Sequence, residues 1–366
     1  MANVTDTIIF PICNKSASNR VVLAPMTNTQ SHLDGQLSND ERRWLTLRAK
    51  GGFGTIITAG AYVEETGKSW DGQIGIHNDV TASAYIPVIE DFREYNSLGI
   101  LQLFHGGMRA KFDAKTNMSP SGGKNSRGDT IARAMSEKEI KDSIAAHVDA
   151  AGRAQRVGFD GVEIHAAHGY LIHQFLSTAT NNRTDEWGGK AENRNRFLIN
   201  IIRGIRDRCG DDFLVGVRLS PEDANWFHGI DFDACIDLSC KLAEDEKADY
   251  LHISLWDAFK PADKYPHDGP AISHFKRNLP NHVPLITAGK IWSAKDADAV
   301  LSYGADMIAL GRVAIAHPSW PNDYGEIDDY KPASPPFTKR YLNGVGLNND
   351  FVAYMTKWKG FVSTAE

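Results

Sequence analysis

Three side chains that can donate hydrogen bonds or transfer protons lie within six residues of one another: His165, His168 and Tyr170. They follow a largely apolar stretch, residues 161–164, that is typical of a buried strand. The turn after such a strand is where α/β proteins carry their chemistry. The two histidines could hold a metal ion, or they could donate two N–H groups to one substrate oxygen, with Tyr170 as a proton source.

The spacing of the histidines favours oxygen binding over a metal site. In helical zinc motifs the two histidines stand four residues apart on one helix, whereas His165 and His168 are three apart across a strand-to-turn junction. No carboxylate or third ligand stands obviously beside them in the sequence, so we predict no metal. Two alternatives stay open: a metal-dependent barrel hydrolase, and a Tyr170 that merely packs against Phe175 and Trp187 in the core.

The elements that must position these residues alternate between strand and helix along nearly the whole chain. Eight short apolar strands, each followed by a helical segment, predict a closed (β/α)₈ TIM barrel of the α/β class, with a doubly wound open sheet as the alternative. We expect strands at residues 21–24, 55–59, 100–105, 213–219, 250–254, 284–288 and 307–310, and a further strand, the fourth in the chain, that begins at residue 161. Because no linker interrupts them, we predict one domain over residues 1–366.

Other segments complete the predicted barrel. Residues 8–19 should form a hairpin that plugs its bottom, and residues 108–134 and 255–270 should be long βα loops. Capping boxes predict helix starts at Ser38/Glu41, Ser136/Glu139 and Ser293/Asp296. Further helices are expected over residues 82–97 with a stop at Gly99, over 191–209 and 232–246, and within 339–357.

The carboxyl ends of all strands of such a barrel face one site. Gln102 carries a donor and an acceptor in one plane, which suits a heterocycle edge with N–H and C=O groups. It could equally be a satisfied core amide. Arg218, at the end of an apolar strand, needs an anionic or carbonyl partner. An ion pair with Glu163 would satisfy it without any ligand.

Glycines at the last two strand ends predict a phosphate site. Gly289 and Gly311 would let backbone N–H groups approach an anion, and Arg312 adds a fixed charge. The loops after strands seven and eight often bind phosphate in barrels. Residues 313–316 could add a short helix N-terminus. Alternatively, both glycines only form tight turns.

Composition narrows the class of protein. A net charge of −6 argues against nucleic-acid binding, and no apolar run approaches the roughly 18 residues that span a bilayer. The start of the chain does not read as a signal peptide. The four cysteines are scattered, so structural zinc, iron–sulfur clusters and disulfides are not expected. We therefore expect a cytoplasmic protein with reduced thiols.

The motifs around these residues resemble those of the Old Yellow Enzyme family of FMN-dependent NAD(P)H ene-reductases. The most specific block is HAAHGYLIHQFLS (residues 165–177), followed by NRTDEWGG (182–189) and ENR (192–194). LAPMT (23–27) and IALGR (308–312) extend the resemblance over essentially the full length.

The resemblance implies an FMN at the carboxyl ends of the strands and assigns roles to thirteen residues. His165 and His168 would bind the substrate's oxygen, and Tyr170 would be the proton donor. The expected cofactor-binding residues are Ala24, Pro25, Met26, Thr27, Ala59, Gln102, Arg218, Gly289, Gly311 and Arg312. Within this set, Arg218 would lie near N1 and C2=O of the flavin, and Gly289, Gly311 and Arg312 would hold the phosphate.

The implied reaction has two halves that share one site. NADPH or NADH would reduce FMN, and flavin N5 would then pass hydride to an α,β-unsaturated carbonyl compound or another activated alkene while Tyr170 supplies the proton. A flavin-binding sensor without turnover stays open as an alternative. The chain lacks the cysteine cluster of longer relatives, so a stand-alone reductase is expected, as a monomer or homo-oligomer. It also has Thr27 and Thr29 where one subgroup has cysteine and tyrosine.

Overall fold

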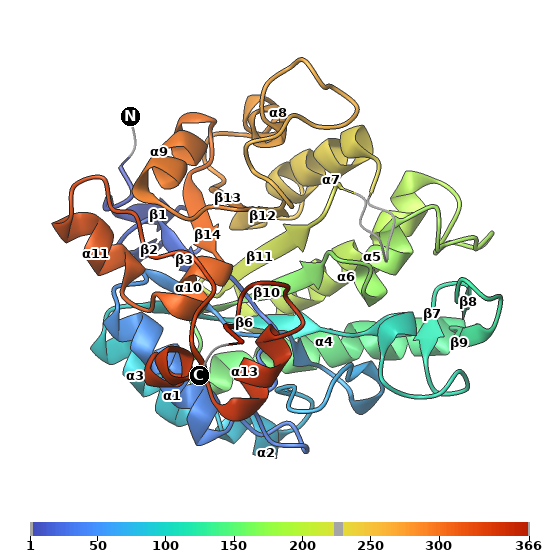
Figure 1. Ribbon diagram of the computed structural model, residues 1–366. Helices are drawn as coiled ribbons and strands as arrows, with labels where there is room; N and C mark the ends of the chain where they lie inside the picture. Colours follow the sequence, from blue (N-terminus) through green and yellow to red (C-terminus); the bar gives the residue numbers. More distant parts are fainter. Residues whose placement is uncertain (1–2, 223–229, 365–366) are drawn as a thin grey trace.

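Short buried strands form the centre of the computed structural model, which describes residues 3–222 and 230–364 (Figure 1). Within these residues eight parallel strands pair in the order β3-β4-β6-β10-β11-β12-β13-β14, and β14 pairs with β3 to close the ring. They are β3 (Val21–Leu23), β4 (Thr55–Ile57), β6 (Leu98–Phe104), β10 (Gly161–Ala166), β11 (Leu214–Leu219), β12 (Tyr250–Ser254), β13 (Leu285–Ala288) and β14 (Met307–Leu310). The predicted (β/α)₈ barrel is confirmed, and the open-sheet alternative is wrong.

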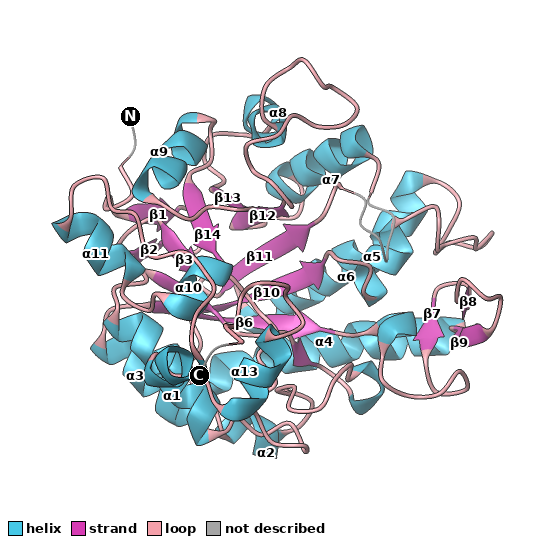
Figure 2. Ribbon diagram, viewed as in Figure 1, coloured by secondary structure: helices cyan, strands magenta, loops and turns pink. Residues whose placement is uncertain are grey.

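Helices surround the barrel on its outside (Figure 2). Five of them begin where the sequence predicted: α1 (Asn39–Lys50), α4 (Glu137–Val157), α6 (Ala191–Cys209), α7 (Phe232–Glu244) and α9 (Ala294–Ser302). The others described are α2 (Asp79–Ser83), α3 (Ile86–Glu94), α5 (Leu171–Leu176), α8 (Ala271–Asn278), α10 (Arg312–Ala316), α11 (Trp320–Glu326), α12 (Lys339–Gly344) and α13 (Asn349–Met355). Among the described residues, every helix is too short or too polar to cross a lipid bilayer.

Three details of the helix prediction are wrong. The helix expected over residues 82–97 is two helices, α2 and α3, because Pro87 in the first turn of α3 cannot donate a backbone hydrogen bond to the preceding turn. Gly99 lies inside β6 rather than at a helix end. The segment 339–357 also holds two helices, α12 and α13, each with its own N-cap.

The predicted hairpin is present at the amino-terminal end of the barrel. β1 (Ile8–Phe10) and β2 (Lys15–Ala17) pair antiparallel. Phe10 is buried in the same apolar cluster as Leu214 and Tyr250, the first residues of β11 and β12, and its ring lies 5.9 Å from that of Tyr250. The hairpin therefore fills one end of the barrel, which leaves the carboxyl ends of the strands for a site.

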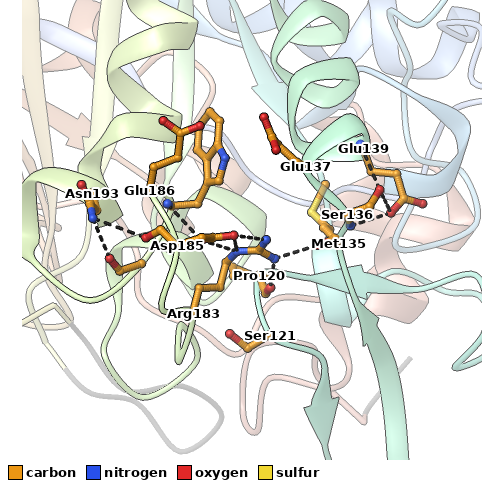
Figure 3. A network of polar contacts seen from close by, with 12 residues as sticks. Pro120, Ser121, Met135, Ser136, Glu137, Glu139, Arg183, Asp185, Glu186 and Asn193 are labelled. Atoms are coloured by element: carbon orange, nitrogen blue, oxygen red, sulfur yellow. Dashed lines mark hydrogen bonds and ion pairs between the residues drawn. The ribbon is translucent and has the colours of Figure 1, made fainter.

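The long segment after β6 has structure of its own. It contains a short 3-10 helix, η2 (Gly107–Arg109), and a small sheet of β7 (Met118–Ser119), β8 (Gly123–Lys124) and β9 (Thr130–Ala134). Arg183, after α5, donates to the carbonyl groups of Pro120 and Met135, both at 2.7 Å, and pairs with Asp185 (Figure 3). These bonds tie the small sheet to the chain that follows β10. The remaining short elements are β5 (Ala61–Tyr62) and η1 (Glu65–Gly67).

Candidate active site

β10 and the turn that joins it to α5 carry the three predicted catalytic side chains: His165 lies in β10, and His168 and Tyr170 lie in the turn. The side-chain amide of Gln174 bridges this turn to the loop after β6: its Nε2 donates to the Gly169 carbonyl at 2.8 Å, and its Oε1 accepts from the Met108 N–H at 3.2 Å. The backbone of His168 has a left-handed φ of +58°, which is uncommon for a residue other than glycine. The bridge therefore holds an unusual backbone that sets the direction of the His168 side chain.

Hydrogen bonds indicate the tautomer of His165 and orient the ring of His168. Nδ1 of His165 accepts from the Ala167 N–H at 3.3 Å, so its proton is on Nε2. Nε2 of His168 lies 2.9 Å from Oγ of Ser254, which also accepts from Nη2 of Arg218 at 3.0 Å. The Ser254 hydroxyl can accept from Arg218 and still either donate to Nε2 of His168 or accept from it, so this contact orients the His168 ring without fixing its tautomer.

Both imidazoles are neutral. Burial lowers the pKa of His165 and of His168 well below the usual value, and the positive charge of Arg218 lowers each further. The two rings lie 5.1 Å apart. Each neutral imidazole carries one N–H donor, and an uncharged carbonyl or phenol oxygen can accept from two such donors.

Tyr170 packs beside this pair under a cation. Its ring lies 4.4 Å from that of Phe104 and 5.1 Å from that of His165. The guanidinium of Arg109 lies 4.4 Å from the Tyr170 ring centre, and its Nη1 donates to the His168 carbonyl. Burial raises the pKa of Tyr170, and Arg109 opposes that rise. The phenol is therefore protonated at neutral pH, as a proton donor must be.

Two structural alternatives drawn from the sequence are wrong. Phe175, proposed as a packing partner of Tyr170, instead stacks on Phe197 with ring centres 4.2 Å apart. Arg218 does not pair directly with Glu163: its guanidinium donates to Ser254 and, at 3.4 Å, to the Pro25 carbonyl.

Gln102, expected at the edge of a heterocycle, is satisfied in part by the protein itself. Its Nε2 donates to Oε1 of Glu163 at 2.8 Å, inside the barrel. One N–H of the amide therefore binds the protein, whereas its other N–H and its carbonyl oxygen make no hydrogen bond to the described residues.

The glycines at the last two strand ends play different parts. Gly289 has a φ of +148°, and a Cβ there would lie 2.8 Å from the backbone nitrogen of Ala258, so only glycine fits. At Gly311 a Cβ would meet only Met26 Sδ, at 3.7 Å, so the space beside it is open. The guanidinium of Arg312 lies 5.8 Å from the ring of Trp358. Gly289 is thus needed for close packing, while Gly311 and Arg312 border an open space.

A cavity of about 820 Å³ lies over the carboxyl ends of the strands. Ten of the thirteen predicted residues line it: Ala24, Pro25, Met26, Thr27, His168, Tyr170, Arg218, Gly289, Gly311 and Arg312. The other three, Ala59, Gln102 and His165, are buried just behind its wall, at exposures of 5%, 2% and 5%. His165 still adjoins the cavity, because its ring lies 5.1 Å from both His168 and Tyr170.

The cavity suits a flavin nucleotide. Its volume is within the about 300–1,000 Å³ usual for ligand pockets. Apolar strand ends line one part, and Gly311 with Arg312 lies at another. Nε of Arg218 is buried and has no hydrogen-bond partner among the described residues. A buried donor of this kind calls for an acceptor from a ligand, and a flavin edge supplies one.

Several cavity residues carried no clear sequence signal. Arg109 comes from η2, Glu222 and Trp256 follow β11 and β12, and Tyr354 and Trp358 come from α13 and the chain beyond it. The sequence hinted at only two of them, Arg109 and Trp256, because these lie in the long loops expected after β6 and β12. Within the described part of the chain, no three His, Cys, Asp or Glu side chains are grouped as metal ligands would be.

Comparison with known proteins agrees with this site. The model of the NADH:flavin oxidoreductase / NADH oxidase family matches residues 10–326. The chain is 36% identical over 310 residues to the probable NADH-dependent flavin oxidoreductase YqiG of Bacillus subtilis, covering 83% of this chain and 82% of that protein. It is 35% identical over 314 residues to the NADH:fumarate oxidoreductase of Klebsiella pneumoniae, covering 82% of this chain but 34% of that longer protein.

A solved structure extends the agreement to three dimensions. The old yellow enzyme homologue from Zymomonas mobilis has a TM-score of 0.76 and 26% identity, covering 93% of this chain and 96% of that one. The chain therefore belongs to the Old Yellow Enzyme family of FMN-dependent NAD(P)H oxidoreductases.

Proposed function

We propose that this enzyme reduces the carbon–carbon double bond of α,β-unsaturated carbonyl compounds and other activated alkenes, with NADPH or NADH as reductant. One observation carries the proposal: two neutral imidazoles, each with one N–H, adjoin a protonated Tyr170 at one cavity. When bound, FMN would supply the hydride-transfer chemistry in two separate half-reactions, with NAD(P)H as hydride donor in the first and the alkene as hydride acceptor in the second.

We assign the predicted cofactor residues to three parts of FMN. Ala24, Pro25, Met26, Thr27 and Ala59 would border the isoalloxazine, Gln102 and Arg218 its pyrimidine edge, and Gly289, Gly311 and Arg312 the phosphate. The positions of these residues around or just behind one cavity support this assignment. We also assign residues 1–366 to one FMN-binding domain, although this range includes residues outside the described part.

The histidines and Tyr170 would act on the substrate. Nε2–H of His165 and the ring N–H of His168 would donate to the substrate oxygen, which stabilises the negative charge that develops there when the β-carbon is reduced. Tyr170 would give its phenol proton to the α-carbon. Arg109, fixed over the Tyr170 ring, would stabilise the charge left after that transfer.

The visible spectrum of the purified protein tests the proposal. A yellow protein bleached by NADPH or NADH under anaerobic conditions, and restored by cyclohexenone, is the expected result. A protein that is bleached but not restored by cyclohexenone or other activated alkenes would be a flavoprotein without this activity, as the sensor alternative requires. A colourless protein that takes up no FMN would contradict the proposal.

A further inference from the structure

A layer of buried polar side chains crosses the inside of the barrel behind the cavity. At its centre is Glu163 of β10, which is 0% exposed. Its carboxylate accepts three hydrogen bonds, from Nε2 of Gln102 at 2.8 Å, Oη of Tyr250 at 3.1 Å and Nδ1 of His252 at 2.9 Å. The three donors come from β6 and β12, so Glu163 links strands on both sides of β10.

The barrel is shaped to admit this carboxylate network. Glu163 stands opposite Gln102 on one neighbouring strand and opposite Gly216 on the other. A Cβ on Gly216 would lie 2.0 Å from Cζ of Tyr250. Only glycine therefore lets the Tyr250 ring pass β11 and bring its hydroxyl to Glu163.

Glu163 is the negative charge of this layer. Burial alone would raise the pKa of Glu163, but His252, Arg218 and Gln102 together hold it below its usual value. Burial and Arg218 lower the pKa of His252, which is neutral and donates through Nδ1. Arg218 is the positive charge, so the layer holds one charge of each sign inside the barrel.

The two charges act differently on a ligand in the cavity. Arg218 lines the cavity, and its Nε has no hydrogen-bond partner among the described residues. Glu163 does not line the cavity, and its carboxylate is covered by the three side chains that donate to it. A flavin gains negative charge when it is reduced. Arg218 favours that gain and Glu163 opposes it, and low-dielectric surroundings strengthen both effects.

Resting on the proposed placement of FMN, we propose that Glu163 is a positioning residue that lowers the reduction potential of the bound flavin. It does so in two ways. It balances the charge of Arg218, and it holds one N–H of Gln102, so that the amide presents a fixed donor and acceptor pattern to the pyrimidine edge. A lower potential makes the reduced enzyme a stronger hydride donor to the alkene.

The test is the midpoint potential of the bound flavin in Glu163→Gln, measured on the holoenzyme by equilibration with a reference dye. We expect a shift to a more positive potential. The matched control is Tyr250→Phe, which removes one hydrogen bond to Glu163 but leaves its charge, and we expect a much smaller shift. An unchanged potential in Glu163→Gln, or an equal shift in both variants, would overturn the proposal.

A second pair of variants covers the case in which Glu163→Gln, with Arg218 left unbalanced, gives no folded holoenzyme. The double variant Glu163→Gln/Arg218→Gln leaves neither charge buried alone. At alkaline pH, where Glu163 keeps its charge without Arg218, the potential of the double variant should be more positive than that of Arg218→Gln, and equal potentials there would contradict the proposal. The midpoint potential can be measured on bound flavin without alkene turnover. A failed cyclohexenone assay with a shifted potential would therefore refute only the proposed substrate. A successful cyclohexenone assay with an unchanged potential would refute only the role of Glu163.

Discussion

Replacing Tyr170 by phenylalanine isolates the proposed proton transfer. The contacts of Tyr170 with Phe104, at 4.4 Å, and His165, at 5.1 Å, are made by its ring, and Arg109 lies over the ring face. Phenylalanine keeps all of these and loses only the hydroxyl. The hydrogen bonds of His165 and His168 do not involve Tyr170, so the oxygen-binding pair should stay in place.

The expected effect is confined to one half-reaction. A positioned general acid contributes about 10²–10⁴-fold, so reoxidation of the reduced enzyme by cyclohexenone should slow by that factor, or about 3–5 kcal/mol of barrier. Reduction by NADPH transfers no proton from Tyr170 and should be nearly unchanged. In the wild type, reoxidation should be independent of pH from about pH 6 to about pH 10, because burial raises the pKa of Tyr170 above the usual value near 10.

Anaerobic stopped-flow absorbance measures the two half-reactions separately. The control is Tyr303→Phe, a tyrosine at the end of α9 that does not line the cavity, for which neither rate should change. If Tyr170→Phe slows both half-reactions equally, or slows reoxidation less than about tenfold, Tyr170 is not the proton donor.

Three further predictions concern binding and stability. His165→Ala should weaken phenol binding to the holoenzyme about tenfold, through loss of one hydrogen bond, and an unchanged Kd in an absorbance titration would contradict the oxygen-binding role. Gly216→Ala should lower the free energy of unfolding by about 1–3 kcal/mol through overlap with Tyr250, whereas Gly325→Ala, which meets nothing within 4 Å, should not. Burial lowers the pKa of His147 to about 4. The unfolded chain therefore binds a proton that the folded protein does not, and stability should fall by up to about 3 kcal/mol between about pH 6.5 and 4. Urea unfolding at several pH values should show a shallower fall for His147→Gln.

Much of the barrel could be predicted because its signals are local. β12 and β14 begin and end at the predicted residues. β14 is a continuous apolar run, as expected of a strand buried on both faces, and Leu251 and Ile253 mark β12. Once eight such strands are recognised, their carboxyl ends must converge, which is why Arg218, Gly289 and Gly311 could be assigned to one site.

The remaining features depend on contacts that the sequence does not encode locally. An ion pair with Glu163 was the alternative left open for Arg218, but the strand register places Glu163 opposite Gln102 and Gly216. Register depends on the stagger of the whole barrel. Tyr354 reaches the cavity only because residues far apart in sequence pack together, and no local pattern signals that.

α13 and Trp358, which follows soon after it, form part of the cavity wall. Their late place in the sequence has a consequence for how the protein acquires its cofactor during synthesis of the chain. The backbone N–H of Asn348 donates to Oε1 of Gln30 at 2.9 Å, and from there α13 brings Tyr354 to the cavity that Thr27 also lines. The ribosome makes Thr27 early and Trp358 more than three hundred residues later. The cofactor therefore meets a complete wall only after nearly the whole chain has emerged, and a nascent chain stalled before α13 should fail to retain FMN.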